Sequence, residues 1–240
     1  MSILVVTGTD TGVGKTVVTA AVASLARERG SSVAVVKPAQ TGVSGAEPGD
    51  MEDVIRLSGV RTTFEVARYP AALSPAAAAR LAGLPPVSLS LVADRIRELA
   101  GSHRLVIVEG AGGLLVRFDE EGATLADLAR TLSAPVLLVT RAGLGTLNHT
   151  ALTLEAMAHR GLEPAGVVIG SWPAEPGPAE RSNVADLEML AARPLAGAMP
   201  EGAGRLERGS FASAAHLGLG PPLGGGFDPA AFRTTLRLSP

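Results

Sequence analysis

Residues 7–16, TGTDTGVGKT, follow a short apolar run and end in Gly-Lys-Thr. The strict pattern of a phosphate-binding loop, G-x-x-x-x-G-K-[ST], requires a glycine at position 9, but the chain has Thr9 there, and Gly8 stands one residue too early. A strand, a glycine-rich turn and a Lys-Thr pair that opens a helix are nevertheless the arrangement in which backbone N–H groups surround phosphate. We therefore predict a nucleotide-binding loop rather than a glycine-rich turn before an ordinary helix.

The glycines and the Lys-Thr pair of this segment each have an expected task. Gly12 and Gly14 can adopt backbone conformations closed to other residues, and they let phosphates approach closely. Lys15 would reach the β- and γ-phosphate oxygens, and the hydroxyl of Thr16 would ligate Mg²⁺. The expected nucleotide-binding residues of this segment are Gly12, Val13, Gly14, Lys15, Thr16 and Val17.

Short apolar runs rich in β-branched residues recur along the chain, at residues 3–6, 33–36, 105–108, 136–139 and 167–169. Continuous runs of this kind are typical of strands that are covered on both faces, as in a parallel sheet. Helical periodicity occurs between them, at residues 16–29, 89–100, 125–132 and 146–160. The alternation predicts a doubly wound, mostly parallel α/β sheet in three layers, with the fold of a P-loop NTPase.

The composition limits what else the chain can be. Its 240 residues suffice for one α/β domain with a buried core, and we expect no second full domain. Because the net charge is −2 and basic runs are absent, we expect no nucleic-acid-binding surface. The chain has no cysteine, which excludes disulfides, thiolate metal sites and cysteine nucleophiles. Without a secretory segment or an apolar run of membrane-spanning length, we expect a cytoplasmic protein that contacts no membrane.

Two segments are expected to lie outside the regular elements. Residues 174–180, rich in Pro, Glu and Gly, are predicted to form a surface loop, and residues 218–226 are predicted to form a flexible Gly/Pro tail region. A last short helix is expected after Asp228, which would cap it, with Pro229 at its first position.

In a doubly wound sheet, ligands bind at the carboxyl ends of the strands, and two charged residues stand there. Lys37 follows the second apolar run in KPAQTG and could stabilise charge that develops in phosphoryl transfer, although a solvated surface lysine is the alternative. Glu109 follows the third run and is expected to be the metal-side acid, rather than a solvated carboxylate in a glycine-rich turn. The glycines that follow, Gly110, Gly112 and Gly113, would let phosphate or substrate come close, and Ala111 is expected to be a further nucleotide-binding residue.

Two further segments are ambiguous from the residues alone. Asp50 could be a second Mg²⁺ ligand, but its position before Glu52 and Asp53 favours a helix N-cap, and both roles can hold at once. Residues 143–149, GLGTLNH, lie where a strand turns into a helix. Free N–H groups there could bind a carboxylate, or the turn could be a simple capped helix start.

Four motifs together resemble one enzyme family. GTDTGVGKT, KPAQTG, VEGAGGLL and LGTLNHT occur in the order and at the spacing typical of dethiobiotin synthetases, a family whose first motif is written GTDTxVGKT. The resemblance covers residues 3–170, weakens beyond residue 173, and accounts for the displaced glycine at position 8. It implies a Mg²⁺- and ATP-dependent ligase of biotin synthesis that carboxylates 7,8-diaminopelargonate with CO₂ and closes a ureido ring, giving dethiobiotin, ADP and phosphate.

The resemblance assigns roles to the charged residues. It implies that Lys15 and Lys37 neutralise the charge of phosphate and of a carbamate formed on one amine. The implied metal ligands are Thr16, Asp50 and Glu109. Alignment on the residues that follow favours Asp50 over Asp53 for this role.

Substrate contacts are implied by the same resemblance. Thr11 and Thr41 would contact the carbamate or the amines, and Gly112 and Gly113 would face the substrate. The substrate carboxylate would be bound by residues of the partner subunit, which implies a homodimer with sites at the interface. The residues implied for that carboxylate are Gly145, Thr146, Leu147 and Asn148.

The nucleotide base has no side-chain partner of the usual kind. Family members often contact adenine with an asparagine after the strand near residue 169, whereas residues 170–173 are GSWP here. A backbone-lined pocket of this kind could accept another nucleoside triphosphate, such as CTP. The backbone groups expected near the base are those of Gly170, Ser171, Pro200, Glu201 and Gly202.

One alternative has a different function on the same fold. Partitioning and division-site ATPases, which switch partners, share the Gly-Lys-Thr ending of the loop. They usually carry a second lysine near position 10, where this chain has Asp10, and often a basic amphipathic segment, which is not visible here. A cobyrinate-type amide ligase would need an added glutaminase domain with a cysteine, which the length and composition exclude.

Overall fold

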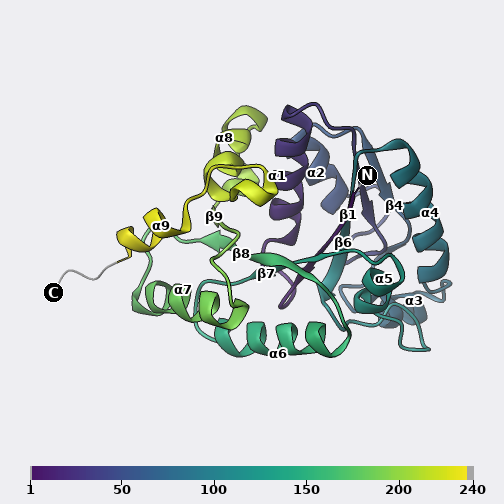
Figure 1. Ribbon diagram of the computed structural model, residues 1–240. Helices are drawn as coiled ribbons and strands as arrows, with labels where there is room; N and C mark the ends of the chain where they lie inside the picture. The colour runs from purple at the N-terminus through teal and green to yellow at the C-terminus, as the bar shows by residue number, and fades with distance from the viewer. Residues whose placement is uncertain (1, 237–240) are drawn as a thin grey trace.

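The computed structural model describes residues 2–236. Within this range seven strands form one sheet in the order β4-β2-β6-β1-β7-β8-β9, and every pairing is parallel. The strands are β1 (Ser2–Gly8), β2 (Val33–Lys37), β4 (Thr62–Glu65), β6 (Leu105–Gly113), β7 (Val136–Thr140), β8 (Pro164–Trp172) and β9 (Gly197–Pro200). Because β1 lies between β6 and β7, the loop after it leaves the middle of the sheet's carboxyl edge (Figure 1).

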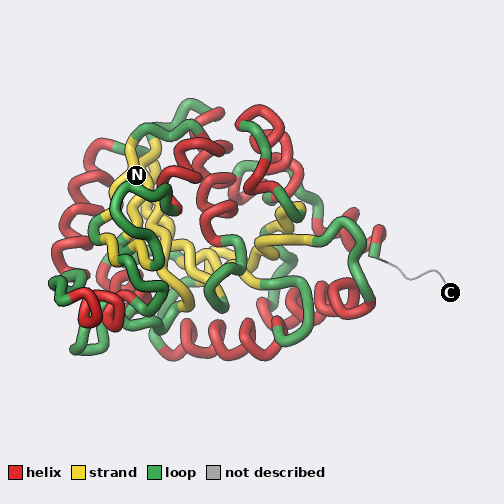
Figure 2. The backbone as a smooth tube through the Cα atoms, turned by 180° about the vertical axis from the view of Figure 1, so that it is seen from behind, coloured by secondary structure: helices red, strands yellow, loops and turns green. Residues whose placement is uncertain are grey.

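Helices cover both faces of this sheet, since successive strand residues point to opposite faces and both sets are apolar. Val6 and Val35 pack with α1 (Lys15–Glu28), α2 (Asp50–Ser58) and α8 (Arg208–Gly218). Val5 and Val36 face α3 (Pro75–Ala82), α4 (Leu89–Ser102) and α5 (Leu125–Thr131), and the same face carries α6 (Thr146–His159) and α7 (Pro178–Ala191). The three layers are visible from both sides (Figures 1 and 2).

The doubly wound prediction is confirmed. The five apolar runs are strands β1, β2, β6, β7 and β8, and the four predicted helices are α1, α4, α5 and α6. The last helix, α9 (Pro229–Thr235), begins where expected, because Oδ1 of Asp228 accepts the N–H groups of Ala230 and Ala231. Within residues 2–236, no helix combines the length and the apolar composition that crossing a membrane requires.

Sequence patterns miss the elements that are short or polar. The edge strands β4 and β9 have the sequences TTFE and GAMP, which contain no continuous apolar run. A separate parallel pair joins β3 (Gln40–Thr41) to β5 (Arg68–Tyr69). This pair is only two residues long, yet it places Gln40 and Thr41 at the cavity described below.

Two segments predicted to be irregular are more ordered than expected. Helix α7 begins at Pro178, a residue suited to the first helical position, so the predicted surface loop 174–180 ends before that residue. Residues 218–226 are not a loose tail, because they include the short helix η2 (Pro221–Leu223) and bury Leu219 and Leu223. A Cβ on Gly225 would lie 2.0 Å from the Leu219 carbonyl oxygen. The glycines here therefore allow close packing.

Candidate functional site

The loop between β1 and α1 has the geometry of a phosphate cradle. Gly12 and Gly14 have φ values of +71° and +97°, which favour glycine, and Gly14 is the N-cap of α1. A Cβ on Gly14 would also lie 2.6 Å from the carbonyl oxygen of Gly170, so a side chain has no room there. Because α1 begins at Lys15, its free N–H groups and the positive end of its dipole face the loop.

The displaced glycine of the motif has a packing reason. A Cβ on Gly8 would lie 2.7 Å from Cγ2 of Val13 and 2.9 Å from the carbonyl oxygen of Asp10. Thr9, in contrast, donates its N–H to the carbonyl oxygen of Val139 at 2.9 Å, as a residue continuing the strand would. The loop therefore needs its glycine at position 8, and a threonine at position 9 is compatible with the turn.

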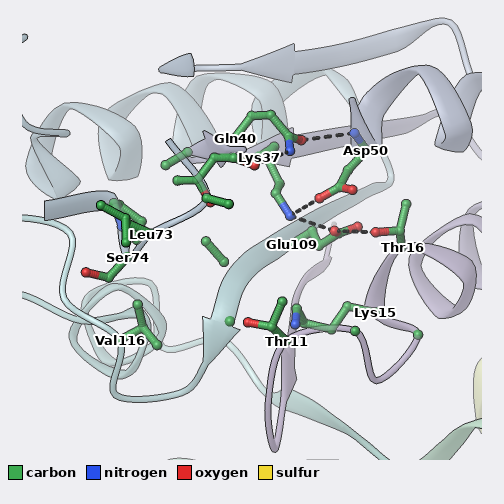
Figure 3. Close-up of a pocket in the computed structure, with 18 of the residues that line it drawn as sticks. Thr11, Lys15, Thr16, Lys37, Gln40, Asp50, Leu73, Ser74, Glu109 and Val116 are labelled. Carbon is green, nitrogen blue, oxygen red and sulfur yellow. Dashed lines mark hydrogen bonds and ion pairs between the residues drawn. The ribbon is translucent and has the colours of Figure 1, made fainter. Parts of the chain in front are cut away.

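A cluster of two buried charges and one half-buried charge lies beside this loop (Figure 3). Nζ of Lys37, at the end of β2, lies 2.5 Å from Oδ2 of Asp50 and 2.8 Å from Oε1 of Glu109. The same ammonium donates to the carbonyl oxygen of Gly110 at 3.2 Å. Oγ1 of Thr16 donates to Oε1 of Glu109 at 2.9 Å. The starts of α1 and α2 and the strands β2 and β6 thus converge on one group of polar side chains.

Burial and charge together determine the protonation of this cluster. Lys37 and Glu109 are 3% and 0% exposed, so neither is the solvated surface residue that the sequence left as an alternative. Burial alone would lower the pKa of Lys37, but Glu109 and Asp50 outweigh it and raise that pKa. Burial would likewise raise the pKa of Asp50, but Lys37 outweighs it and lowers that pKa. The ammonium and the Asp50 carboxylate are therefore both charged at neutral pH.

Lys15 has a different environment. Its Nζ donates to the carbonyl oxygen of Asp10 at 2.9 Å, a contact within the loop itself. Burial, followed by the charge of Lys37, lowers the pKa of Lys15 to about 8. An anion beside Nζ would favour the charged form, because opposite charges stabilise each other where water is scarce. The loop is thus arranged to receive a negatively charged group.

Asp50 does not cap its own helix, which corrects the interpretation favoured from the residues alone. The N-cap of α2 is Gly49, and Asp50 is the first helical residue. Gly49 donates its N–H to the Glu52 carboxylate at 2.8 Å, and Asp50 donates its N–H to Oε1 of Gln40 at 2.9 Å. Asp53 lies in an exposed ion pair on the helix surface. Of the two aspartates weighed as metal ligands, the structure brings Asp50 to the cluster.

The loop and the charge cluster open into one cavity of about 640 Å³. The predicted residues that line it are Thr11, Gly12, Gly14, Lys15, Thr16, Val17, Lys37, Thr41, Asp50, Glu109, Ala111 and Gly112. The lining residues that sequence reasoning missed are Ala39, Gln40, Ala72, Leu73, Ser74, Pro75 and Val116. Two of these, Ala39 and Gln40, lie within the KPAQTG motif and could have been found there. Residues 72–74 precede α3 and Pro75 begins it, and these residues reach the cavity only through the tertiary fold.

Other predicted residues do not line the cavity. A Cβ on Gly110 would lie 2.3 Å from Cδ2 of Leu125, and one on Gly170 would lie 2.0 Å from the carbonyl oxygen of Val13. At Gly110 the missing side chain therefore accommodates protein, which revises the expectation that it admits phosphate or substrate. Val13 is buried, and Gly113 lies in register with the end of β1.

The residues expected near the base gather at the carboxyl ends of β8 and β9. Trp172 lies in register with Pro200, and Glu201 donates its N–H to the Trp172 carbonyl oxygen at 2.8 Å. In the turn that follows, the backbone of Gly204 lies against Val17 of α1. These groups are close to the start of the nucleotide-binding helix but do not line the cavity itself.

The turn at residues 145–148 is also separate from the cavity within one chain. Gly145 is the N-cap of α6 with a φ of +86°. The hydroxyl of Thr146 is buried and donates to the carbonyl oxygen of Arg141 at 2.6 Å. Asn148 is exposed, and Leu144 is 88% exposed. The turn therefore presents a helix N-terminus at the surface, which is compatible with the expected carboxylate contact from another subunit.

Oxygen atoms suited to a hard cation converge at the cluster. Thr16, Asp50 and Glu109 offer hydroxyl and carboxylate oxygens, the ligand type that Mg²⁺ prefers. Oε2 of Glu109 is buried and has no hydrogen-bond partner among residues 2–236. A cation beside it would satisfy that oxygen, so these residues fit Mg²⁺. The described residues contain no group of three His, Cys, Asp or Glu side chains around a metal position, so phosphate and water oxygens would complete the coordination.

Known proteins resemble this chain over nearly its whole length. A family described as an AAA domain matches residues 2–204. The ATP-dependent dethiobiotin synthetase BioD of Parafrankia sp. strain EAN1pec is 63% identical over 233 residues, which cover 97% of this chain and 98% of the relative. The protein of the same name from Streptomyces coelicolor is 58% identical, over 97% of this chain and 98% of the relative. The one from Mycobacterium avium is 54% identical, over 88% of this chain and 92% of the relative.

Solved structures share the fold at low sequence identity. The MinC:MinD cell division protein complex of Aquifex aeolicus has a TM-score of 0.56 at 12% identity, covering 100% of this chain and 98% of that chain. A ParA family ATPase from Chlorobium tepidum has a TM-score of 0.54 at 15% identity, covering 93% and 95%. At these identities the likeness concerns the fold alone. The motifs, the cavity and the close relatives together show that the chain belongs to the family of ATP-dependent dethiobiotin synthetases.

Proposed function

We propose that the chain carboxylates 7,8-diaminopelargonate with CO₂ and closes the ureido ring of dethiobiotin, converting ATP to ADP and phosphate, as a step of cytoplasmic biotin synthesis. The names of the relatives support the product and the use of ATP. The observation that carries the proposal is the placement of Lys15 and Lys37 in one cavity with Thr16 and Glu109. Two cations of this kind suit a reaction in which anionic phosphate and anionic carbamate must meet.

The proposed reaction needs no protein nucleophile. One amine adds to CO₂, forms a C–N bond and loses a proton, giving a carbamate. A carbamate oxygen then attacks the γ-phosphorus of ATP, so that an O–P bond forms, the bond to the bridging oxygen breaks and ADP leaves. The second amine attacks the carbonyl carbon, phosphate leaves with the broken C–O bond, and the amine loses a proton as the ring closes. The protein contributes mainly positioning and charge stabilisation.

The side chains of the cavity divide these tasks. Lys15 neutralises charge on the β- and γ-phosphates, where the loop and the start of α1 direct N–H groups. Lys37 is held between Asp50 and Glu109. It would face the carbamate and the phosphoryl group that is transferred to the carbamate. We propose that Thr11 and Thr41 contact the carbamate or the amines. Gly112, with Gly113 beside it, would face the substrate chain. Thr11, Thr41 and Gly112 line the same cavity.

Thr16, Asp50 and Glu109 would hold Mg²⁺, which when bound neutralises charge on the β- and γ-phosphate oxygens. The buried and unpartnered Oε2 of Glu109 supports this assignment. The Lys37 ammonium forms an ion pair with each of the two carboxylates. The same carboxylates can therefore serve a lysine and a metal.

We also propose a homodimer in which the turn at residues 145–148 binds the substrate carboxylate held in the partner's cavity. Two observations support it. The turn lies outside the cavity of its own chain, and the apolar side chains Leu144 and Leu152 of this turn and of α6 are 88% and 57% exposed. Exposed apolar side chains next to a helix N-terminus are consistent with burial against a second copy.

For the nucleotide base, we propose contacts with the backbone of Gly170, Ser171 and residues 200–202. No side-chain amide is present at residues 170–173 to match the edge of adenine. CTP should therefore support turnover besides ATP. Comparing initial rates with the two nucleotides at equal concentration tests this, and strong discrimination for ATP would contradict it.

The deciding experiment measures phosphate release with and without 7,8-diaminopelargonate and bicarbonate, together with dethiobiotin formation. The proposal requires that both compounds be present for release, in a ratio of one phosphate to one dethiobiotin. Release that needs neither would instead favour a partitioning-type switch ATPase. The carboxylate of Asp10, where such ATPases carry lysine, pairs with Arg141 at 3.1 Å, which does not favour that alternative.

A further inference from the structure

Gln40 is the only glutamine of the chain, and its side chain is buried in the cavity wall. It belongs to β3, which pairs with β5 beside the main sheet. Its Oε1 accepts the N–H of Asp50 at 2.9 Å, and its Nε2 donates to the carbonyl oxygen of Thr41 at 3.1 Å (Figure 3). The Gln40 amide thus joins the start of α2 to Thr41, which we propose contacts the substrate.

The start of α2 depends on this contact because its N-cap is a glycine. Gly49 has no side-chain oxygen that could accept an N–H of the first turn, as Ser, Asp or Asn would. Glu52 accepts the N–H of Gly49, which leaves the N–H of Asp50 to Gln40. Because Gln40 caps α2 from another segment, the Asp50 carboxylate is free to approach Lys37.

Close packing explains why position 49 is a glycine. A Cβ on Gly49 would lie 3.0 Å from Oε1 and 3.1 Å from Cδ of Gln40. The φ of Gly49 is −111°, a value open to every residue, so the requirement is for space and not for an unusual backbone conformation. A side chain at position 49 would therefore push the Gln40 amide aside by a few tenths of an ångström and strain its hydrogen bond to the Asp50 N–H.

We infer that Gln40 is a positioning residue for the metal site. Its side chain holds Asp50 so that the Asp50 carboxylate faces Mg²⁺ and Lys37. The inference rests on the proposed function, in which Asp50 is a Mg²⁺ ligand. Groups that orient a metal ligand commonly change metal affinity by about tenfold or more when they are removed. Loss of Gln40 should thus weaken the binding of nucleotide with Mg²⁺ and leave metal-free binding unchanged.

Calorimetric titration of the full chain with ADP, once with Mg²⁺ and once with EDTA, measures the factor by which Mg²⁺ tightens nucleotide binding. For Gln40→Met, which keeps the length and removes the amide, we expect this factor to fall about tenfold. Gly49→Ala keeps the Gln40 amide but places a methyl group against it, so it should also lower the factor by which Mg²⁺ tightens ADP binding. This variant tests the inference even where Gln40→Met fails to fold. Gly101→Ala, the same change at a helix glycine with open space around it, should leave the factor unchanged.

A spectroscopic measurement reports on the amide directly. With ¹⁵N in the side chain of its only glutamine, the protein gives one pair of N–H signals at a single ¹⁵N frequency, which should shift in Gly49→Ala and when Mg²⁺ and ADP are added.

Three variants separate this inference from the proposed function. A wild-type factor in Gln40→Met and Gly49→Ala, with a reduced factor in Asp50→Asn, would overturn the inference alone. A wild-type factor in Asp50→Asn as well would overturn it together with the metal assignment, whereas dethiobiotin formation by the wild type tests the proposed reaction separately.

Discussion

Lys37→Met removes an ammonium and keeps a similar stem, so it tests how strongly the fold depends on the buried charge. In the native chain Glu109 is 0% exposed and its paired cation is Lys37, at 2.8 Å. Removing one partner of a buried pair costs about 3–5 kcal/mol, because the other charge is left uncompensated. For a domain of this size each kcal/mol lowers Tm by about 2–4 °C, so we expect a loss of roughly 6–20 °C.

Thermal unfolding without nucleotide measures this loss, and dethiobiotin formation measures activity, which should be absent in Lys37→Met. The double variant Lys37→Met/Glu109→Gln removes both charges of the fully buried pair and leaves only Asp50, whose side chain is 34% exposed, so it should regain most of the stability and stay inactive. Arg130→Met is the matched control. Its ion pair with Asp127 is exposed on both sides and contributes less than about 1 kcal/mol.

Three results would contradict this reasoning. A Tm of Lys37→Met within about 2 °C of the wild type would mean that the buried pair contributes less than about 1 kcal/mol. A double variant no more stable than the single one would mean that the isolated Glu109 charge does not cause the loss of stability. Near-normal dethiobiotin formation by Lys37→Met would refute the proposed role of the ammonium in the reaction.

Four further variants, in three experiments, test other contacts. Gly170→Ala should lower the stability by about 1–3 kcal/mol and weaken ADP binding, because its Cβ would lie 2.0 Å from the Val13 carbonyl oxygen; unchanged affinity in a calorimetric titration would argue against this support of the loop. Asp50→Asn should remove most dethiobiotin formation while Asp53→Asn should not, and equal rates for the two variants would contradict their placement. Burial alone would raise the pKa of Asp127, but two hydrogen bonds from Thr124 outweigh burial and lower that pKa. The Asp127 carboxylate therefore stabilises the fold above its ordinary pKa of 3.8, and this stabilisation is lost as the pH falls through the lower pKa of the folded state. Asp127→Ala should therefore be less stable by about 1 kcal/mol at pH 7, and the difference, followed by urea unfolding, should shrink below pH 4.

The sheet was predictable because its central strands have a strong pattern. Runs such as residues 105–108 are apolar on both faces, and only a strand or a buried helix fits them. The edge strand β4, TTFE, is half-buried along its length and therefore lacks that pattern. Its place beside β2 is decided by backbone pairing with Val36 and its neighbours, which no local pattern records.

The site was predictable where a motif contains its own geometry. Residues 9–16 form the loop from one continuous segment, so their order in the sequence is also their order around the phosphate position. Asp50 is different, because Gly-Asp-x-Glu has the same appearance whether the aspartate caps its helix or faces Lys37. That choice is made by Gln40, which reaches the helix start from another element. The position of a side chain at a helix start can thus depend on a contact that the local sequence does not contain.

The scarcity of lysine is a property of the whole chain that points to the same site. Of 21 lysine and arginine residues only two are lysines, and both line the cavity. Arginine stays charged in every environment and suits the exposed ion pairs of this surface, such as that of Arg130. Lysine is a compact ammonium whose pKa its surroundings can move, and here burial lowers the pKa of Lys15 while carboxylates raise that of Lys37. The two lysines thus stand where a small cation with a movable pKa fits among oxygen atoms, and this distribution supports the proposed role of Lys37.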